Sequence, residues 1–231
     1  MPVTVIVNLR AATGGKLPRS IHCLIHAVFL ERISRTNDAM GRRIHGGGAP
    51  FAISPIMGAR ERVIENETYW VRFSLLTEDL AGVFLDAMEK HIWNEPIRLE
   101  NHRFIPEDIV FGGRPGLPWS GSATFGDLMA QGGEADRLTL FIESPVSFKR
   151  GDLHYPLPEP GLIANNLTRR WNAVSSWPLP TQPSWEEIGV SFLNLKSQPY
   201  PLRKGGTIVG VTGKLTFIGK GSPEKLRQFN A

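Results

Sequence analysis

Two cations and a histidine stand together early in the chain, where they could support acid–base chemistry. His45 follows Arg42 and Arg43 and precedes three glycines, so an imidazole and two guanidinium groups lie beside a flexible segment. A histidine side chain has an ordinary pKa of about 6.5, and it can therefore take or give a proton near neutral pH. Metal-free cleavage of a phosphodiester needs a base, an acid and cations that stabilise the phosphorane. A solvated histidine at a helix end is the alternative interpretation.

A second histidine pair lies on a predicted helix. His22 and His26 are four residues apart at the edge of an apolar stripe, a spacing that can hold a metal ion. No Glu follows His22 directly and no third ligand is placed by the sequence, so a half-buried pair on the helix flank is the alternative. The single cysteine, Cys23, excludes an intrachain disulfide and a thiolate cluster. The sequence therefore predicts neither a metal nor a cofactor.

Cations and glycines alternate in a segment near the C-terminal end, residues 204–214. Glycines let backbone amides approach phosphates closely, and lysines supply positive charge. The segment matches neither a P-loop nor a dinucleotide fingerprint, and a twisted β-hairpin accounts for it equally well. With the neighbouring basic pairs, the candidate phosphate contacts are Lys149, Arg150, Arg203, Lys204 and Lys214.

Composition limits the classes of protein that the chain can belong to. It has 231 residues, of which 41% are hydrophobic, enough for two small domains with real cores. No apolar run approaches the roughly 20 residues of a membrane span, and the first residues are typical of a strand, so we expect a cytoplasmic protein. Residues 1–136 carry 14 basic and 16 acidic side chains, whereas residues 137–231 carry 12 and 6. This asymmetry favours a polyanionic partner for the C-terminal half.

The first 113 residues predict strands and helices in the order of a ferredoxin-like unit. Apolar residues alternate in the first strand, and they recur every three or four residues in the first helix, where Pro18 is expected in the first turn. The predicted elements are a strand at Val3–Arg10, a helix through Ile21 and Ile33, a helix at Asp38–Ile44, strands at Phe51–Pro55 and Tyr69–Leu75, a helix at Glu78–Ile92, and short strands at Ile97–Leu99, Phe104–Ile105 and Ile109–Phe111.

Residues 114–133 are rich in Gly, Pro and Ser and are predicted to connect this unit to a second one at residues 134–231. The second unit is expected to contain strands at Leu138–Ile142, Ile188–Lys196 and Thr207–Ile218, a helix with Leu162, Ile163, Leu167 and Trp171 on one face, and a last helix at Pro223–Phe229. A ferredoxin-like unit that ends on its second helix lacks its fourth strand. The predicted fold class is therefore α+β, with two tandem ferredoxin-like domains.

Several segments resemble, in order, those of the CRISPR repeat-RNA processing endoribonucleases (the Cas type six family of the RAMP superfamily). The segments are residues 24–30, Arg43-Ile44-His45, residues 50–55, Tyr69-Trp70-Val71-Arg72, residues 142–149, Pro156-Leu157-Pro158 and Trp171-Asn172. The resemblance covers nearly the whole chain. It implies two RRM-like domains and metal-independent cleavage of CRISPR precursor RNA that leaves a 2′,3′-cyclic phosphate and a 5′-hydroxyl.

The resemblance also implies roles for particular residues. His45 matches the family's usual catalytic histidine, and His26 lies where members often carry a tyrosine or histidine. We expect His45 as general acid and His26 as general base or 2′-hydroxyl orienter, with the two roles interchangeable. Where some members have a lysine, this chain has glycines, so Arg42 or Arg43 is the candidate cation.

One departure concerns the end of the chain, where the family's glycine-rich loop is expected after the last helix. The sequence stops at Asn230-Ala231, which suggests a truncated protein or one domain of a fusion with reverse transcriptase and integrase. Expected partners are CRISPR repeat RNA and other Cas proteins or fused domains, with no membrane. Two alternatives to an enzyme remain: a non-catalytic RAMP-type subunit that binds guide RNA, and an assembly domain that docks a polymerase or integrase.

Overall fold

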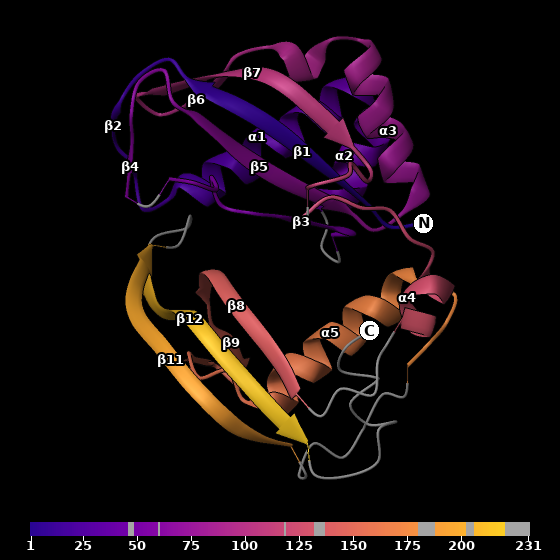
Figure 1. The fold of residues 1–231 in the computed structure, drawn as a ribbon, viewed down its shortest axis with the longest axis vertical. Coiled ribbons are helices and arrows are strands. Elements are labelled where there is room, and N and C mark those ends of the chain that lie inside the picture. Colours follow the sequence, from indigo (N-terminus) through magenta and orange to yellow (C-terminus); the bar gives the residue numbers. More distant parts are fainter. Residues whose placement is uncertain are drawn as a thin grey trace. The chain divides into compact units, whose positions relative to one another are not determined.

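The structure is a computed structural model that describes residues 1–45, 49–59, 61–117, 119–131, 137–179, 188–201 and 206–219. The chain divides into two compact units, Met1–Ala123 and Thr124–Ala231, and each has its own sheet and its own core (Figure 1). The predicted helix at Pro223–Phe229 and the candidate contacts Arg203 and Lys204 lie outside the described residues.

The first unit is built on an antiparallel sheet with the strand order β3-β5-β1-β7-β6. The strands are β1 (Val3–Ala11), β3 (Phe51–Ile53), β5 (Thr68–Leu75), β6 (Ile97–Leu99) and β7 (His102–Phe111), and a separate small sheet pairs β2 (Gly15–Lys16) with β4 (Arg62–Val63). Because side chains alternate along a strand, Val3, Val5 and Val7 all face the core. Strands β3, β5, β1 and β7 are the second, third, first and fourth of a ferredoxin-like unit, which confirms the predicted fold class for this unit.

Helices cover one face of this sheet (Figure 1). They are α1 (Ile21–Thr36), α2 (Asp38–His45), α3 (Glu78–Glu89) and the 3-10 helix η1 (Ile92–Asn94). Phe29, Phe73, Phe84 and Trp93 meet in the centre with ring centroids 4.4 to 6.2 Å apart. Burying each of these side chains contributes roughly 1.5–3 kcal/mol. The aromatic cluster therefore fixes both α1 and α3 to the sheet.

Some boundaries in the first unit differ from the predicted ones. Pro18 precedes α1 instead of lying in its first turn, and its carbonyl accepts a hydrogen bond from the Ile21 N–H at 3.1 Å. The two short strands predicted after residue 103 form one strand, β7. Pro106 is tolerated within it because β6 pairs only with His102–Phe104, so the strand is a sheet edge at the proline. A register shift at Asn8/Leu9 in β1 lies opposite the same point.

The second unit has a three-stranded sheet with the order β11-β12-β8 and a small β9–β10 hairpin. Its elements are α4 (Phe125–Gln131), β8 (Arg137–Val146), β9 (Phe148–Arg150), β10 (Leu153–Tyr155), α5 (Pro160–Val174), β11 (Ile188–Pro201) and β12 (Thr207–Gly219). Strands β8, β11 and β12 occupy the positions of the first three ferredoxin-like strands. The described residues contain no fourth strand of this sheet.

Helix α5 buries a face that is shifted from the predicted one but overlaps it. Ala164 and Thr168 are buried, and Ile163 packs against the small core as predicted, whereas Leu167 remains 48% exposed. The prediction included Leu167 because hydrophobicity alone does not determine which positions face the core. Trp171 is half-buried and contacts Phe125 of α4 edge-to-face, with ring centroids 5.1 Å apart. In the parts of the chain that are described, no helix is long and apolar enough to cross a membrane.

Candidate active site

His45 is the last residue of α2, and its side chain is exposed. The helix is placed by its contact with α1, where Gly41 lies directly against Ser34. A β-carbon at residue 41 would be 2.1 Å from Ser34 Oγ and 2.9 Å from Ser34 Cα, distances that no real contact allows. On the same buried face of α2, the side chains of Met40 and Ile44 pack in the core. The close approach at Gly41 therefore determines where His45 lies.

The two arginines beside His45 are both exposed and both paired with carboxylates. Arg42 forms an ion pair with Asp38 one turn earlier in α2, and Arg43 forms one with Asp79 at the start of α3. Burial acts to raise the pKa of Asp79, but hydrogen bonds from Arg43 and the Leu80 N–H outweigh it and lower that pKa below its ordinary value. Arg43 therefore ties the end of α2 to α3, and its charge is already partly neutralised.

His26 lies on α1 with an exposed side chain. Its ring is 5.3 Å from that of Phe51, at an interplanar angle of 35°. Phe51 begins β3, six residues after His45, and is itself packed against Phe29 of the core at 4.5 Å. His45 thus precedes the connection from α2 to β3, and His26 contacts Phe51, the residue at which β3 begins.

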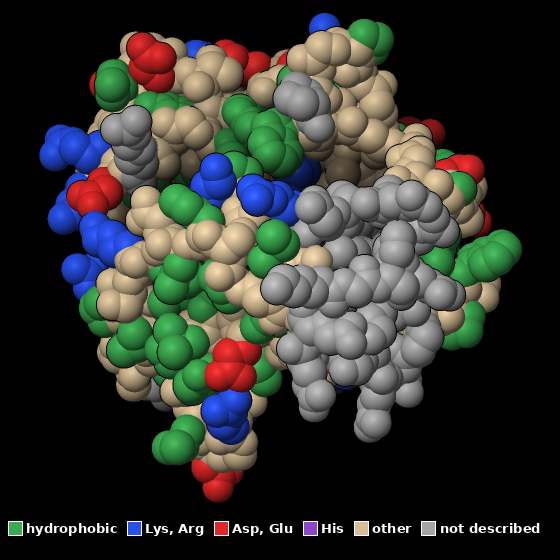
Figure 2. All heavy atoms as spheres, turned by 60° about the horizontal axis from the view of Figure 1, so that its bottom comes forward, with side chains coloured by type: hydrophobic (Ala, Val, Ile, Leu, Met, Phe, Trp, Pro, Cys, Tyr) green, Lys and Arg blue, Asp and Glu red, His purple; other side chains and the backbone are tan. Residues whose placement is uncertain are grey.

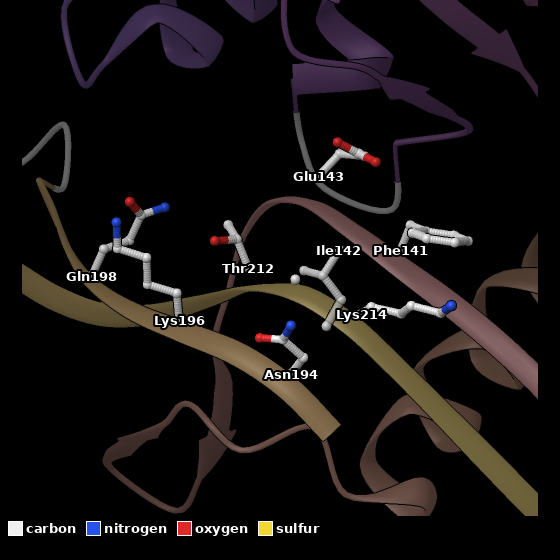
Figure 3. A pocket seen from close by; sticks show the side chains of 9 residues that line it. Phe141, Ile142, Glu143, Asn194, Lys196, Gln198, Thr212 and Lys214 are labelled. Carbon is white, nitrogen blue, oxygen red and sulfur yellow. The ribbon is translucent and has the colours of Figure 1, made fainter. Parts of the chain in front are cut away.

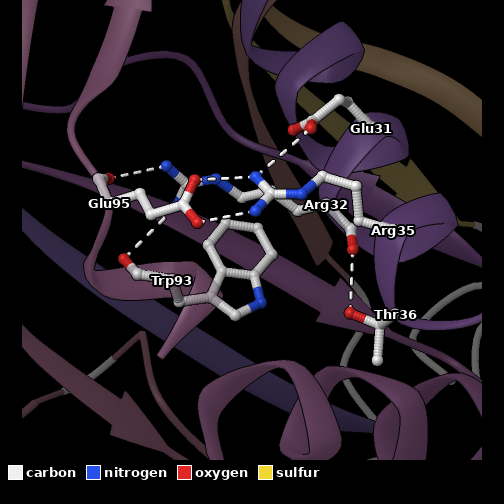
Figure 4. A network of polar contacts seen from close by, with 6 residues as sticks. All are labelled: Glu31, Arg32, Arg35, Thr36, Trp93 and Glu95. Carbon is white, nitrogen blue, oxygen red and sulfur yellow. Dashed lines mark hydrogen bonds and ion pairs between the residues drawn. The ribbon is translucent and has the colours of Figure 1, made fainter. Parts of the chain in front are cut away.

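A buried arginine fixes the C-terminal half of α1 (Figure 4). Arg32 is 3% exposed, and it donates hydrogen bonds to the carbonyl oxygens of Trp93 at 3.3 Å and Glu95 at 2.7 Å. Its guanidinium also lies 4.9 Å from the centre of the Trp93 ring. One turn later, Arg35 binds both carboxylate oxygens of Glu95 at 2.7 Å, and these hydrogen bonds lower the pKa of Glu95. The helix that carries His26 is thus anchored to η1 and the turn after it.

The remaining histidines fall into two groups. His102 is buried and its Nε2 lies 2.9 Å from the carbonyl oxygen of Lys16, and His22 is half-buried, with burial lowering its pKa. His91 and His154 are exposed. Within the described ranges, no group of three or more His, Cys, Asp or Glu side chains is placed to hold a metal ion. His22 and His26 therefore have no third ligand of these types there.

The candidate phosphate contacts of the second unit occupy two places. Lys149 and Arg150 lie on β9, where Arg150 is paired with Glu159 at 2.7 Å and stacks over the Tyr155 ring at 4.5 Å. Lys214 lies on the middle strand β12, pairs in register with Phe141, and is exposed. Lys149 and Lys214 are thus on different sheets of the unit.

Sequence reasoning missed two aromatic side chains beside Lys214. Phe141 is 60% exposed and Phe192 is 46% exposed, although both lie in the sheet. The sequence does indicate the exposure of Phe141, because this residue stands at an outward position of the alternation Leu138-Thr139-Leu140-Phe141-Ile142. The pairing of these strands, which the alternation does not specify, brings them to Lys214.

The strand order of the two units defines an α+β protein built from two ferredoxin-like units. Solved structures with this fold include a Cas6 product complex with 24% identity and a TM-score of 0.77, covering 100% of this chain and 90% of that chain. A Thermus thermophilus Cas6 has 24% identity and a TM-score of 0.68, with 100% and 88% covered. A RAMP protein described as binding different RNA substrates has 14% identity and a TM-score of 0.63, with 96% and 90% covered.

A comparison of the sequence with protein-family models also finds a similarity, and it lies in the second unit. The model of the CRISPR-associated endoribonuclease Cas6 family matches residues 140–231. No curated protein matches the chain by sequence. The family match and the shared fold together confirm the resemblance to the Cas6 family that the sequence indicated.

Proposed function

We propose that this chain is a metal-independent endoribonuclease that cuts CRISPR precursor RNA within its repeats. The ribose 2′-hydroxyl attacks the adjacent phosphorus, the bond to the 5′-oxygen of the next nucleotide breaks, and the products carry a 2′,3′-cyclic phosphate and a 5′-hydroxyl. His45 protonates the leaving 5′-oxygen, and His26 takes or orients the 2′-hydroxyl proton. The same two residues in exchanged roles satisfy the same chemistry.

The proposal rests on the exposure of two histidines, one at each end of the connection between α2 and β3. His45 ends α2, and His26 contacts Phe51 where β3 begins. Both side chains are open to a substrate, and both stand on helices anchored in the core. A histidine side chain can serve as a base or as an acid, so one residue can take a proton while the other gives one.

Stabilisation of the phosphorane requires a cation that reaches the scissile phosphate. Arg42 and Arg43 remain the candidates in the first unit. Each must exchange its carboxylate, Asp38 or Asp79, for a phosphate oxygen when RNA binds. Such exposed pairs are typically worth less than about 1 kcal/mol, so the exchange costs little.

RNA is the proposed partner, and the cations Lys149, Arg150 and Lys214 are its proposed phosphate contacts in the second unit. Arg203 and Lys204 are further proposed contacts. The solved structures that share the fold include a Cas6 product complex and a Cas6 substrate-mimic complex, which supports this proposal. Action in the cytoplasm, with other Cas proteins or fused reverse transcriptase and integrase domains as partners, is part of the same proposal.

The test compares two variants with the same substitution. Repeat RNA from the CRISPR array of the host is incubated with the chain in EDTA, and cleavage and binding are measured for the parent, His45→Asn and His91→Asn. His91 is the matched control because it is an exposed histidine of the same unit, and asparagine tolerates its left-handed backbone of φ 56°. We expect one cut with the parent and the control, and intact but bound RNA with His45→Asn.

Other outcomes separate the alternatives. Binding by all three proteins without any cut would favour a non-catalytic RAMP-type subunit. Absence of binding would favour an assembly domain. A cut that appears only when Mg²⁺ is restored would overturn the metal-independent mechanism while leaving the nuclease.

A further inference from the structure

The outward face of the second sheet carries an aromatic and cationic cluster that the proposed cleavage chemistry does not use. Phe141 on β8 and Phe192 on β11 lie on either side of the middle strand β12. The ammonium of Lys214 lies 5.4 Å from the Phe141 ring centre and 5.5 Å from the Phe192 ring centre. One cation thus bridges two exposed rings on three neighbouring strands.

Polar side chains continue this face along the strands (Figure 3). Asn194 pairs in register with Lys214, and Lys196 follows two residues later on the same face. Together with Phe141, Lys214 and Glu143 they line an open depression of about 550 Å³. The depression has two lysines against one carboxylate and offers an amide group as both donor and acceptor.

The face exposes two large aromatic side chains, Phe141 at 60% and Phe192 at 46%. Large exposed hydrophobic side chains are numerous in this unit, and Figure 2 shows such side chains at the surface with lysines and arginines among them. A protein partner would be expected on a patch from which charged residues are depleted. Here the rings alternate with lysines and an amide, which matches unpaired nucleobases and their phosphates better.

We propose that this face, formed by Phe141, Phe192, Lys214, Asn194 and Lys196, is a stacking platform for single-stranded RNA. One base stacks on each phenylalanine ring, Lys214 and Lys196 bind the adjoining phosphates, and Asn194 hydrogen-bonds a base edge. The platform rests on the proposed function, because it takes RNA as the ligand, and it adds a site for unpaired nucleotides to the proposed site of cleavage.

The test uses two probes that differ only in their bases. Fluorescence anisotropy measures binding of the whole chain to a single-stranded uridine 12-mer and to an abasic 12-mer that keeps the sugars and phosphates. The variants are Phe141→Ala and Phe192→Ala, with Leu193→Ala as the matched control. Leu193 is the next residue on the same strand, is 58% exposed, and lies on the opposite face. Thermal melts establish that each variant is folded.

The expected result is a loss of affinity for the uridine 12-mer of about 5- to 150-fold for each phenylalanine variant. The abasic probe should bind the parent and both variants alike, and Leu193→Ala should behave as the parent. Phe141→Trp should restore binding, since it keeps a ring in place. Unchanged affinity in the phenylalanine variants, or an equal loss with the abasic probe, would overturn the platform alone. Failure of the parent to bind the uridine 12-mer would also overturn the platform, whereas the proposed function would fall only if the parent neither cut nor bound repeat RNA.

Discussion

The two units share the ferredoxin-like strand order, but they differ in how much of their sheets is buried. In the first unit the core extends from β1 to η1 and includes Trp93, Phe29, Phe73 and Phe84, each less than 2% exposed. In the described part of the second unit, the buried cluster consists of Ala164, Ile188, Leu215 and Phe217, with a few half-buried neighbours. The first unit buries these four aromatic side chains, whereas the second leaves Phe141 and Phe192 exposed on the outward face of its sheet.

This difference suggests a division of labour. Acid–base chemistry needs side chains whose positions vary little, and His26 and His45 stand on helices fixed by a large core and by Arg32. Binding of a flexible single strand needs exposed rings and cations instead. The first unit is therefore suited to catalysis and the second to holding RNA, and each prediction below tests that division.

The largest effect is expected for His45, the proposed general acid in the first unit. His45→Asn should lower the single-turnover cleavage rate about 10²- to 10⁴-fold, the usual contribution of a positioned proton donor, with little change in affinity. Lys214→Gln in the second unit should do the reverse, weakening binding and lowering the slope of log affinity against log salt by about 1. If Lys214→Gln lowered the rate at saturating enzyme as much as His45→Asn does, the division of labour would be wrong.

Core truncations should distinguish the units by stability. Phe84→Ala and Phe217→Ala each remove a buried ring and should each cost about 3–5 kcal/mol. Because the buried cluster of the second unit is small, the same loss should unfold that unit at a lower urea concentration than it unfolds the first. Limited proteolysis along the urea titration, with the fragments mapped by mass, measures this. Equal protection of both units in Phe217→Ala would contradict the comparison.

The anchor of α1 should be worth less than a core ring. Arg32→Met keeps a long side chain over Trp93 but leaves the carbonyl oxygens of Trp93 and Glu95 without this donor, at a cost of about 1–3 kcal/mol. Because α1 carries His26, cleavage should fall more steeply than RNA binding. Urea denaturation and single-turnover kinetics measure the two effects. Arg35→Met, which removes only exposed ion pairs with Glu95 and Glu31, is the control and should change stability much less than Arg32→Met does.

A smaller effect of pH on stability is expected from His22. Burial lowers its pKa in the folded state below 6.5, so the unfolded chain binds the proton more tightly. Stability is therefore complete above pH 6.5 and is lost as the pH falls through the folded-state pKa. His22→Gln should remove this loss between pH 7.5 and pH 5, measured by urea denaturation, whereas His91→Asn should retain it. A parent whose stability is constant over that range would refute the assignment.

The parts of the fold that follow a local period could be predicted from the sequence. The alternation of Val3, Val5 and Val7 and the stripe of α1 place core residues without knowledge of their partners. The prediction of two strands at Phe104–Ile105 and Ile109–Phe111 was wrong because Pro106 is tolerated within a single strand where the neighbouring β6 has ended, which is a property of the sheet.

The sequence identifies the candidate site residues by their chemical type, but it does not show which side chains they contact. His45 and His26 were found from their chemistry and the resemblance, and their roles stay predictions. That Arg43 binds Asp79, a residue 36 positions away, could not be seen in the sequence. The phenylalanines of the second sheet were missed for the same reason, since strand pairing alone brings them to Lys214.

The contact between Gly41 and Ser34 has a consequence for how this protein can vary. Replacing Ser34 by a smaller residue would not make room for a side chain at residue 41, because the β-carbon would still lie 2.9 Å from the Cα of residue 34. No single substitution of Ser34 can therefore compensate for a side chain at residue 41. The close spacing of α1 and α2 thus requires glycine at this position. In a screen for inactive variants, substitutions of the buried residue Gly41 should appear beside those of His45.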